Sequence, residues 1–358
     1  MTKNIFLLLI PLFFVACYNN TSSIPDLEEI VKIRFLWEYR TGDYVRSTPK
    51  VDGGKLFIGS DDNNMHALDA TKGDSLWRFE TGDNVTSSPV ISNGQLIFGS
   101  WDGNVYALDK EKGGEQWVFE TQGWVSASPL IDEKRIFIGS HDGILYALNA
   151  NNGSLVWSFE TNGPIESSAT LGEEIIYVAS RDNHLYAINK GTGKQIWAYK
   201  TDGDIVSAPV LDKERVFVSS MDRNLYALDA KSGKLNWSFE AEFPIESSPA
   251  VLEGKLFIGA NDGNLYALNI NNGELIWRVS LNSMMRSSPV LWEHLVIIGS
   301  QDGYLTALDQ NSGEILWRYR TGDGIVATPA INGNKLYVGS LDRKVHAFLI
   351  ERIPSENQ

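Results

Sequence analysis

The side chains best suited to chemistry in this sequence are eight regularly spaced aspartates and five histidines. The aspartates recur every forty residues, at Asp62, Asp102, Asp142, Asp182, Asp222, Asp262, Asp302 and Asp342. Carboxylates and imidazoles act as general acids, general bases or metal ligands when they converge on one site. However, the histidines, at positions 66, 141, 184, 294 and 346, form no HExxH motif and no zinc pattern with the single cysteine. No GxSxG elbow, Walker loop or glycine fingerprint is present either.

The spacing of the aspartates favours a structural role over a catalytic one. An active site needs a single group of catalytic residues, whereas a fold built from repeats needs the same structural residue in every repeat. An Asp before Gly or Asn accepts backbone N–H groups and thereby stabilises a turn. His66 and His346 occupy a position that is Tyr in most repeats, which indicates packing substitutes. Acid–base catalysis is therefore not indicated by these residues.

The repeat itself is clearest in the tryptophans. They recur at a spacing of forty residues without insertion or deletion, at Trp37, Trp77, Trp117, Trp157, Trp197, Trp237, Trp277 and Trp317. An Ala follows each Trp by thirty residues, and a Gly precedes seven of them by four. A period of about forty residues is typical of propellers and solenoids. We expect each Trp to pack between neighbouring repeats as part of the architecture.

Each repeat contains four short runs with the composition of β-strands. In one repeat these are WRFET at 77–81, SSPVI at 87–91, QLIFGS at 95–100 and NVYALD at 104–109. They are rich in Val, Ile, Phe and Tyr and are separated by turn residues, and no stretch has useful helical periodicity. The sequence therefore predicts an all-β fold: an eight-bladed β-propeller of four-stranded antiparallel blades.

Strands from the two ends of the chain are expected to pair and so to close the predicted ring. The last repeat has three strands between 327 and 350 but no Trp strand after them, and the unmatched Trp strand lies at 33–40. We expect this N-terminal strand to join the last blade and close the ring. The propeller is then predicted to span residues 32–350, followed by a C-terminal tail at 351–358.

The N-terminus indicates export and lipid attachment. Residues 1–16 include an apolar run that is too short to span a bilayer but suits a secretory signal peptide. The run ends at Cys17, the only cysteine, and FVAC resembles the bacterial lipobox, with Phe14 where Leu is usual. This resemblance implies a diacylglycerol on Cys17, a second lipid on its amine and a lipidated tether at 17–31. The alternative is an ordinary cleaved signal with an incidental cysteine.

The charge of the chain limits its partners. The formal net charge is −14. Binding of nucleic acid or anionic lipid needs clustered Lys and Arg to neutralise phosphate, so neither partner is expected. We expect contact with a membrane through the lipid anchor only.

Functional residues are expected where the repeat varies. Two variable series fall in loops that open on one face of the ring, here called the channel-mouth face, and some large side chains lie near the same rim. The residues nine after each Trp place Arg286 and Arg46 on a basic arc and Glu166 and Glu246 on an acidic one. The alternative is that these are ordinary solvated loop residues. The candidate protein-binding face comprises Tyr44, Arg46, Trp101, Trp124, His141, Glu166, Arg181, Met221, Glu246, Met284, Arg286 and Tyr304.

Three segments carry a family resemblance. YALDKEKGGEQW at 106–117, YALNANNGSLVW at 146–157 and YALDAKSGKLNW at 226–237 resemble the tryptophan-docking motif of the pyrroloquinoline quinone (PQQ) repeat family. The resemblance covers about 33–350. It implies the propeller fold but leaves function open, because the family includes quinoprotein dehydrogenases, sensor domains and BamB-like outer-membrane assembly lipoproteins.

Among these, the chain is most similar to the BamB-like lipoproteins in length, blade number and lipid-anchored N-terminus. This similarity implies a non-enzymatic scaffold without a cofactor, held in the bacterial outer membrane and facing the periplasm, whose partner is the β-barrel assembly complex. One alternative is a dehydrogenase or ligand sensor that binds PQQ with calcium, although the uniform repeats offer no inserted calcium-binding loops and no Cys pair. Another is a surface or periplasmic lipoprotein with a different protein partner.

Overall fold

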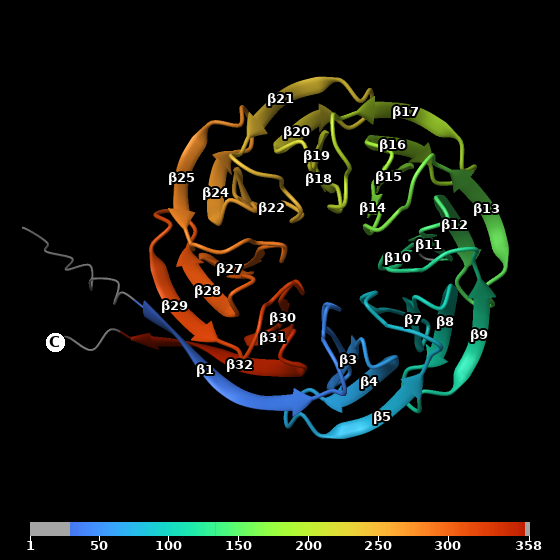
Figure 1. Cartoon of the computed structure of the whole chain (residues 1–358), viewed down its shortest axis with the longest axis horizontal. Coiled ribbons are helices and arrows are strands. Elements are labelled where there is room, and N and C mark those ends of the chain that lie inside the picture. The colour runs from blue at the N-terminus through green and yellow to red at the C-terminus, as the bar shows by residue number, and fades with distance from the viewer. Residues whose placement is uncertain (1–28, 133, 355–358) are drawn as a thin grey trace, which may run out of the picture.

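The computed structural model describes residues 29–132 and 134–354, and these form an all-β ring of eight sheets around a central channel (Figure 1). Each sheet has four antiparallel strands, and no helix occurs among the described residues. The predicted eight-bladed propeller is therefore confirmed. Cys17 and the proposed signal and tether residues before 29 lie outside the described part of the chain.

The first four blades follow one another along the chain. Blade 1 contains β2 (Lys50–Asp52), β3 (Lys55–Gly59), β4 (Asn64–Asp69) and β5 (Ser75–Glu80). Blade 2 contains β6 (Val90–Ser92), β7 (Gln95–Gly99), β8 (Asn104–Asp109) and β9 (Glu115–Glu120). Blade 3 contains β10 (Leu130–Ile131), β11 (Arg135–Gly139), β12 (Ile144–Asn149) and β13 (Leu155–Glu160). Blade 4 contains β14 (Thr170–Leu171), β15 (Ile175–Ser180), β16 (His184–Asn189) and β17 (Gln195–Lys200).

The other four blades complete the ring. Blade 5 contains β18 (Val210–Asp212), β19 (Arg215–Ser219), β20 (Asn224–Asp229) and β21 (Leu235–Glu240). Blade 6 contains β22 (Ala250–Leu252), β23 (Lys255–Gly259), β24 (Asn264–Asn269) and β25 (Leu275–Ser280). Blade 7 contains β26 (Val290–Trp292), β27 (Leu295–Gly299), β28 (Tyr304–Asp309) and β29 (Ile315–Arg320). Blade 8 contains β30 (Ala330–Asn332), β31 (Lys335–Ser340), β32 (Lys344–Pro354) and β1 (Glu29–Arg40).

In every blade the strands run in order from the channel to the circumference (Figure 1). The inner strand is shorter than its sequence predicts. The run SSPVI at 87–91 was expected to be a strand, but β6 covers only Val90–Ser92. Pro89 has no N–H group to donate to a ladder, so regular pairing begins after it.

The ring closes through β1 and β32, as predicted. These strands pair antiparallel from Glu29 opposite Pro354 to Arg40 opposite Lys344, with one irregularity between Phe35 and Trp37. The pairing extends beyond both ends of the 32–350 span expected from the sequence. Because the first and last strands share one ladder, separating the chain ends would break a whole set of backbone hydrogen bonds.

The tryptophans lie at the boundaries between blades. The ring of Trp197 from blade 4 packs against Gly233 of blade 5, and its Nε1 donates a hydrogen bond to the Ala230 carbonyl at 3.1 Å. Trp157, Trp237 and Trp277 donate the same bond to the next blade. Their neighbours across the blade boundary are buried apolar residues, so every blade shares its core with the next one.

The repeated aspartates tie two loops together. The Asp102 carboxylate accepts the backbone N–H of Asn104 at 2.9 Å and that of Gly82 at 2.8 Å, and it also accepts the hydroxyl of Tyr106 at 2.7 Å. Burial and this hydrogen bond raise the pKa of Tyr106 well above its usual value. The carboxylate therefore serves as a fixed acceptor within the turn, which agrees with the structural role predicted for this series.

Candidate protein-binding face

The channel-mouth face is built from two loops of each blade. One loop follows an outer strand, as in residues 121–129, and the other connects the second and third strands of the next blade, as in residues 140–143. The two loops are joined by a backbone hydrogen bond, for example from His141 N to Trp124 O at 2.8 Å. The same bond recurs in all eight blades, so both variable series lie on one face.

The two variable series meet in pairs. A residue from one series contacts the residue fifteen positions later, as in the Arg46–Asp61 ion pair at 2.7 Å and the hydrogen bond from Trp101 Nε1 to Thr86 Oγ1 at 2.8 Å. Asn261 Nδ2 likewise donates to Glu246 Oε1 at 2.7 Å. Sequence reasoning treated the series separately and missed this pairing. The signal was the chemical complementarity of residues fifteen positions apart.

This pairing corrects the expected division of the rim into a basic and an acidic arc. Arg46 is neutralised by Asp61, and Glu166 accepts from Arg181 at 2.7 Å. Arg286 lies 3.1 Å from Glu246 of the preceding repeat, although the two had been assigned to opposite arcs. Each of these four charges therefore has an opposite charge within ion-pair distance, and the rim is not divided into two arcs of unpaired charge.

An aromatic cluster lies on one side of the mouth. The rings of Trp101 and Trp124 stack with centroids 4.8 Å apart and planes within 3° of parallel. His141 packs against Trp124 at 5.5 Å. Trp124 nevertheless remains 50% exposed. The cluster thus presents a flat apolar surface that is already held in place before any partner arrives.

A charged network continues from this cluster. Ser126 Oγ and His141 Nε2 lie 2.9 Å apart, and Glu166 Oε1 lies 3.5 Å from the same imidazole nitrogen. Arg181 bridges Glu166 and Asp204. Burial lowers the pKa of His141, and the positive charge of Arg181 adds to this effect against the opposing charge of Glu166. Burial therefore favours a neutral imidazole at pH 7.

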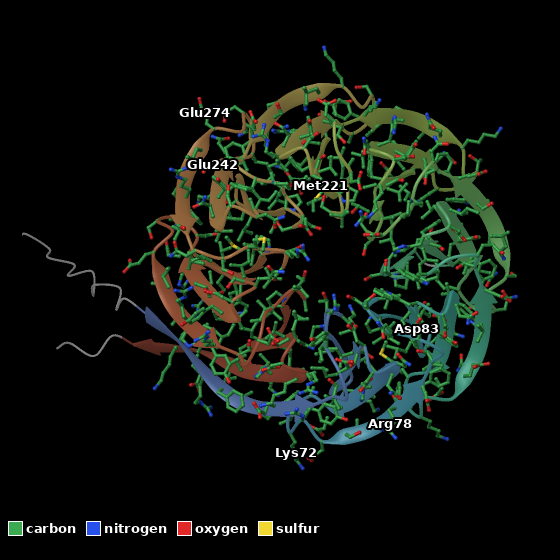
Figure 2. The ribbon with its side chains drawn as sticks, viewed as in Figure 1. Lys72, Arg78, Asp83, Met221, Glu242 and Glu274 are labelled. Carbon is green, nitrogen blue, oxygen red and sulfur yellow. The ribbon has the colours of Figure 1, made fainter. Side chains whose placement is uncertain are left out.

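The other predicted residues differ in position. Tyr44 and Met284 are exposed on the loops of this face. Met221 is half-buried on the inner part of the ring (Figure 2). Tyr304, in contrast, begins β28 opposite Arg320 of the outer strand and packs under Arg318, with 4.2 Å from the guanidinium carbon to the ring centroid, so it lies toward the circumference.

Sequence reasoning also missed Phe243, which is 57% exposed on the loop after β21. Every other repeat has Gly, Asp or Ser at this position, which is the signal that could have identified it. Large exposed aromatic side chains are more informative of docking than charged ones, because they bury more apolar area at little entropic cost. We add Phe243 to the channel-mouth face.

The channel itself does not fit a calcium-bound quinone. A cavity of about 410 Å³ is lined mainly by small hydroxyl side chains, such as Ser88, whose backbone N–H bonds Ser128 Oγ at 2.9 Å. Glu166 is the only carboxylate in its lining, and that side chain is engaged with Arg181. Among residues 29–132 and 134–354, no group of three His, Cys, Asp or Glu side chains is placed to hold a metal ion. Calcium in proteins takes six to eight oxygen ligands, several of them carboxylates.

The fold and the face together define a class of protein: an eight-bladed, tryptophan-docked propeller with a preformed aromatic surface at one mouth of its channel. The chain belongs to the family described as outer membrane protein assembly factor BamB, whose sequence profile matches residues 34–89, 67–171, 145–288 and 242–352. No curated protein matches the sequence. None of the described residues forms a helix able to cross a membrane.

Several solved structures share the fold. BamB from Moraxella catarrhalis has a TM-score of 0.78 and 19% identity, over 89% of this chain and 100% of that chain. A europium-containing methanol dehydrogenase has a TM-score of 0.77 and 14% identity, over 88% and 93%. A quinohemoprotein alcohol dehydrogenase from Comamonas testosteroni has a TM-score of 0.77 and 16% identity, over 91% and 78%. At these identities the likeness shows the fold alone, and it extends to BamB and to dehydrogenases alike.

Proposed function

We propose that this protein is a non-enzymatic scaffold that binds a protein partner through its channel-mouth face and assists the assembly of outer-membrane β-barrel proteins. The observation that carries the proposal is the stacked pair Trp101 and Trp124, in which half-buried Trp101 holds the exposed ring of Trp124. Tryptophan and arginine are the residues most enriched at interface hot spots, and Arg181 lies close to this stack through His141 and Glu166. Membership in the BamB family supports the choice of partner.

The proposal includes anchoring through Cys17. A lipid on this residue would hold the propeller at the outer membrane, in the bacterial envelope, without contact between the acidic ring and anionic lipid. The variant Cys17→Ala should release the protein from the membrane fraction, and mass spectrometry of the mature N-terminus should find acyl chains on wild-type protein. Retention of Cys17→Ala on membranes would contradict this part of the proposal.

Affinity purification from detergent-solubilised membranes tests the scaffold directly. Wild-type protein should recover the β-barrel assembly complex, and Trp124→Ala should lower the recovery about tenfold or more, as expected for a hot-spot residue. Leu155→Ala is a matched control, because Leu155 is 51% exposed but lies on the outer strand β13. Equal losses in both variants, or unchanged recovery with Trp124→Ala, would refute the role of the face. Recovery of a different stable complex would replace the proposed partner.

The enzyme and sensor alternatives are tested by adding PQQ, calcium and an artificial electron acceptor to purified protein. Sustained oxidation of an alcohol or sugar would refute the scaffold proposal. A rise in the unfolding temperature without turnover would favour a ligand sensor, since a ligand that binds only the native state stabilises it.

A further inference from the structure

A second candidate binding site lies between blades 7 and 8, beside the β1–β32 ladder that closes the ring. The pocket is bordered by the ends of β1 and β29, the loop from 341 to 343 and the beginning of β32. Tyr44 lines it, so it opens beside the channel-mouth face but closer to the circumference. Its volume of about 610 Å³ is in the usual range of small-molecule sites, roughly 300–1,000 Å³.

Three arginines converge on this pocket without a carboxylate partner. Arg40 ends β1, Arg320 ends β29, and Arg343 lies in the loop before β32. Across residues 29–132 and 134–354, no ion pair of these three guanidinium groups is found, and the Arg320 guanidinium carbon lies 5.4 Å from the centroid of the Tyr304 ring. All three residues are exposed, and positive charges that line one pocket attract an anion.

The arginines also break the repeat. The residue three after each Trp is glutamate in four blades, at Glu80, Glu120, Glu160 and Glu240. The same position is Ser280 in blade 6, Lys200 in blade 4, and Arg40 and Arg320 in blades 8 and 7, which are the two blades that form the pocket. Blades 7 and 8 are therefore the only adjacent pair among the eight that both carry a basic residue at this position.

Two of the four carboxylates of the pocket have side-chain partners, and within the described part of the chain the other two accept only a backbone N–H group. Glu38 Oε1 accepts from Lys344 Nζ at 2.7 Å, and Asp342 Oδ2 accepts from Gly322 N at 2.9 Å and lies 3.0 Å from His346 Nε2. Asp43 and Asp323 each accept one backbone N–H through Oδ1. The second oxygen of each of these two aspartates remains available to accept a hydrogen bond from a bound hydroxyl group.

His346 provides an independent observation. This pocket-lining imidazole is only 2% exposed, and its Nδ1 has no hydrogen-bond partner among the described residues. Glu38 Oε2 lies 3.9 Å from that nitrogen, beyond hydrogen-bond distance. In blade 1 the equivalent His66 Nδ1 is 3.4 Å from Tyr39 Oη. A buried polar atom without a partner is unfavourable, so a ligand group that reached it would relieve that cost.

We propose that this pocket binds a small, hydroxylated oxyanion, that is, a phosphorylated or carboxylated ligand of about sugar size. Arg40, Arg320 and Arg343 hold the oxyanion, because the planar guanidinium group binds phosphate and carboxylate oxygens in pairs. Asp43 and Asp323 accept from hydroxyl groups of the ligand, and His346 Nδ1 meets a further polar group. This inference goes beyond the scaffold function and does not depend on a protein partner.

Isothermal titration of the purified full-length protein tests the site, with inorganic phosphate, citrate and glucose 6-phosphate as probes at low ionic strength. Saturable binding is expected, weakened by added NaCl. Arg40→Gln and Arg343→Gln should each weaken it about tenfold, the usual effect of removing a charged hydrogen bond. Arg78→Gln is the matched control, since Arg78 also lies on an outer strand, β5, and has no ion pair with any of the described residues, but it lies away from the pocket (Figure 2).

Tighter binding of glucose 6-phosphate than of citrate would assign a phosphorylated ligand, and the reverse order a polycarboxylate; either supports the proposal. Failure of all three probes to saturate, or an equal loss in Arg78→Gln, would overturn it. The pocket variants should also retain capture of the protein partner. If they lost partner capture and no probe bound, the pocket would be a contact for an acidic protein segment, and the small-ligand assignment would be wrong.

Discussion

Replacing Gly233 by alanine should destabilise the propeller, because the ring of Trp197 packs directly against this glycine. Gly233 has a φ of +71°, and a Cβ atom built there would lie 2.6 Å from Trp197 Cδ2. Trp197 is buried and donates a hydrogen bond to Ala230 O, so its ring has little freedom to move aside. The substitution tests whether tryptophan docking holds neighbouring blades together.

Two costs add in this variant. An alanine in the left-handed region costs about 1–2 kcal/mol, and overpacking a well-filled contact costs about 1–3 kcal/mol more. The free energy of unfolding should therefore fall by about 2–5 kcal/mol. Gly254→Ala isolates the first cost, since Gly254 has a φ of +79° and no atom within 4 Å of the built Cβ. That control should lose only about 1–2 kcal/mol.

Equilibrium unfolding in urea, followed by tryptophan fluorescence and by circular dichroism, gives these differences when the two transitions coincide. The midpoint should shift in Gly233→Ala by clearly more than in Gly254→Ala, with a similar slope. Equal shifts in the two variants would show that the Trp197 ring yields without cost. The contact between Trp197 and Gly233 would then contribute nothing to the free energy that holds blades 4 and 5 together.

Three further predictions use the same unfolding assay. Trp197→Ala should lower stability by about 3–5 kcal/mol, and a loss below 1 kcal/mol would contradict its role between blades. Burial raises the pKa of Asp62, but hydrogen bonding to His66 and to backbone N–H groups outweighs this and lowers the pKa to about 2, below the ordinary value of an aspartate. Its stabilisation is therefore present above pH 4 and lost as pH falls toward 2, and Asp62→Asn should be less sensitive to acid over that window. Burial instead lowers the pKa of His141, so the native state binds fewer protons than the unfolded chain below about pH 6.5. Stability should decline as pH falls below that value, and His141→Gln should flatten the decline.

Much of the fold could be predicted because each blade repeats the same local information. Trp77, Ala107 and Asp102 recur at fixed intervals, and the short runs between them have strand composition and turn residues at their ends. The unmatched strand at 33–40 likewise indicated how the ring closes. The inner strands were predicted too long, because Pro89 was counted within a strand whose ladder it cannot join.

The candidate sites were less predictable, because they depend on residues that do not repeat. Repeat alignment correctly placed both variable series on one face but gave no distances, so the Arg46–Asp61 and Glu246–Arg286 pairs were missed. The converging Arg40 and Arg320 were missed for another reason. They lie at opposite ends of the chain and become neighbours only when β1 joins β32.

The sequence by itself determined the number of blades, the strands of each blade and the joint that closes the ring, since these follow from local patterns copied in every repeat. Only the tertiary structure decided which variable side chains meet: the Trp101–Trp124 stack, the ion pairs of the mouth and the pocket between blades 7 and 8. The physical reason is that a side chain's partners in a closed ring come from the neighbouring blade. Two residues can therefore be far apart in the sequence and still lie within the few ångströms over which hydrogen bonds and ring contacts act, and the sequence alone does not show which pairs do so.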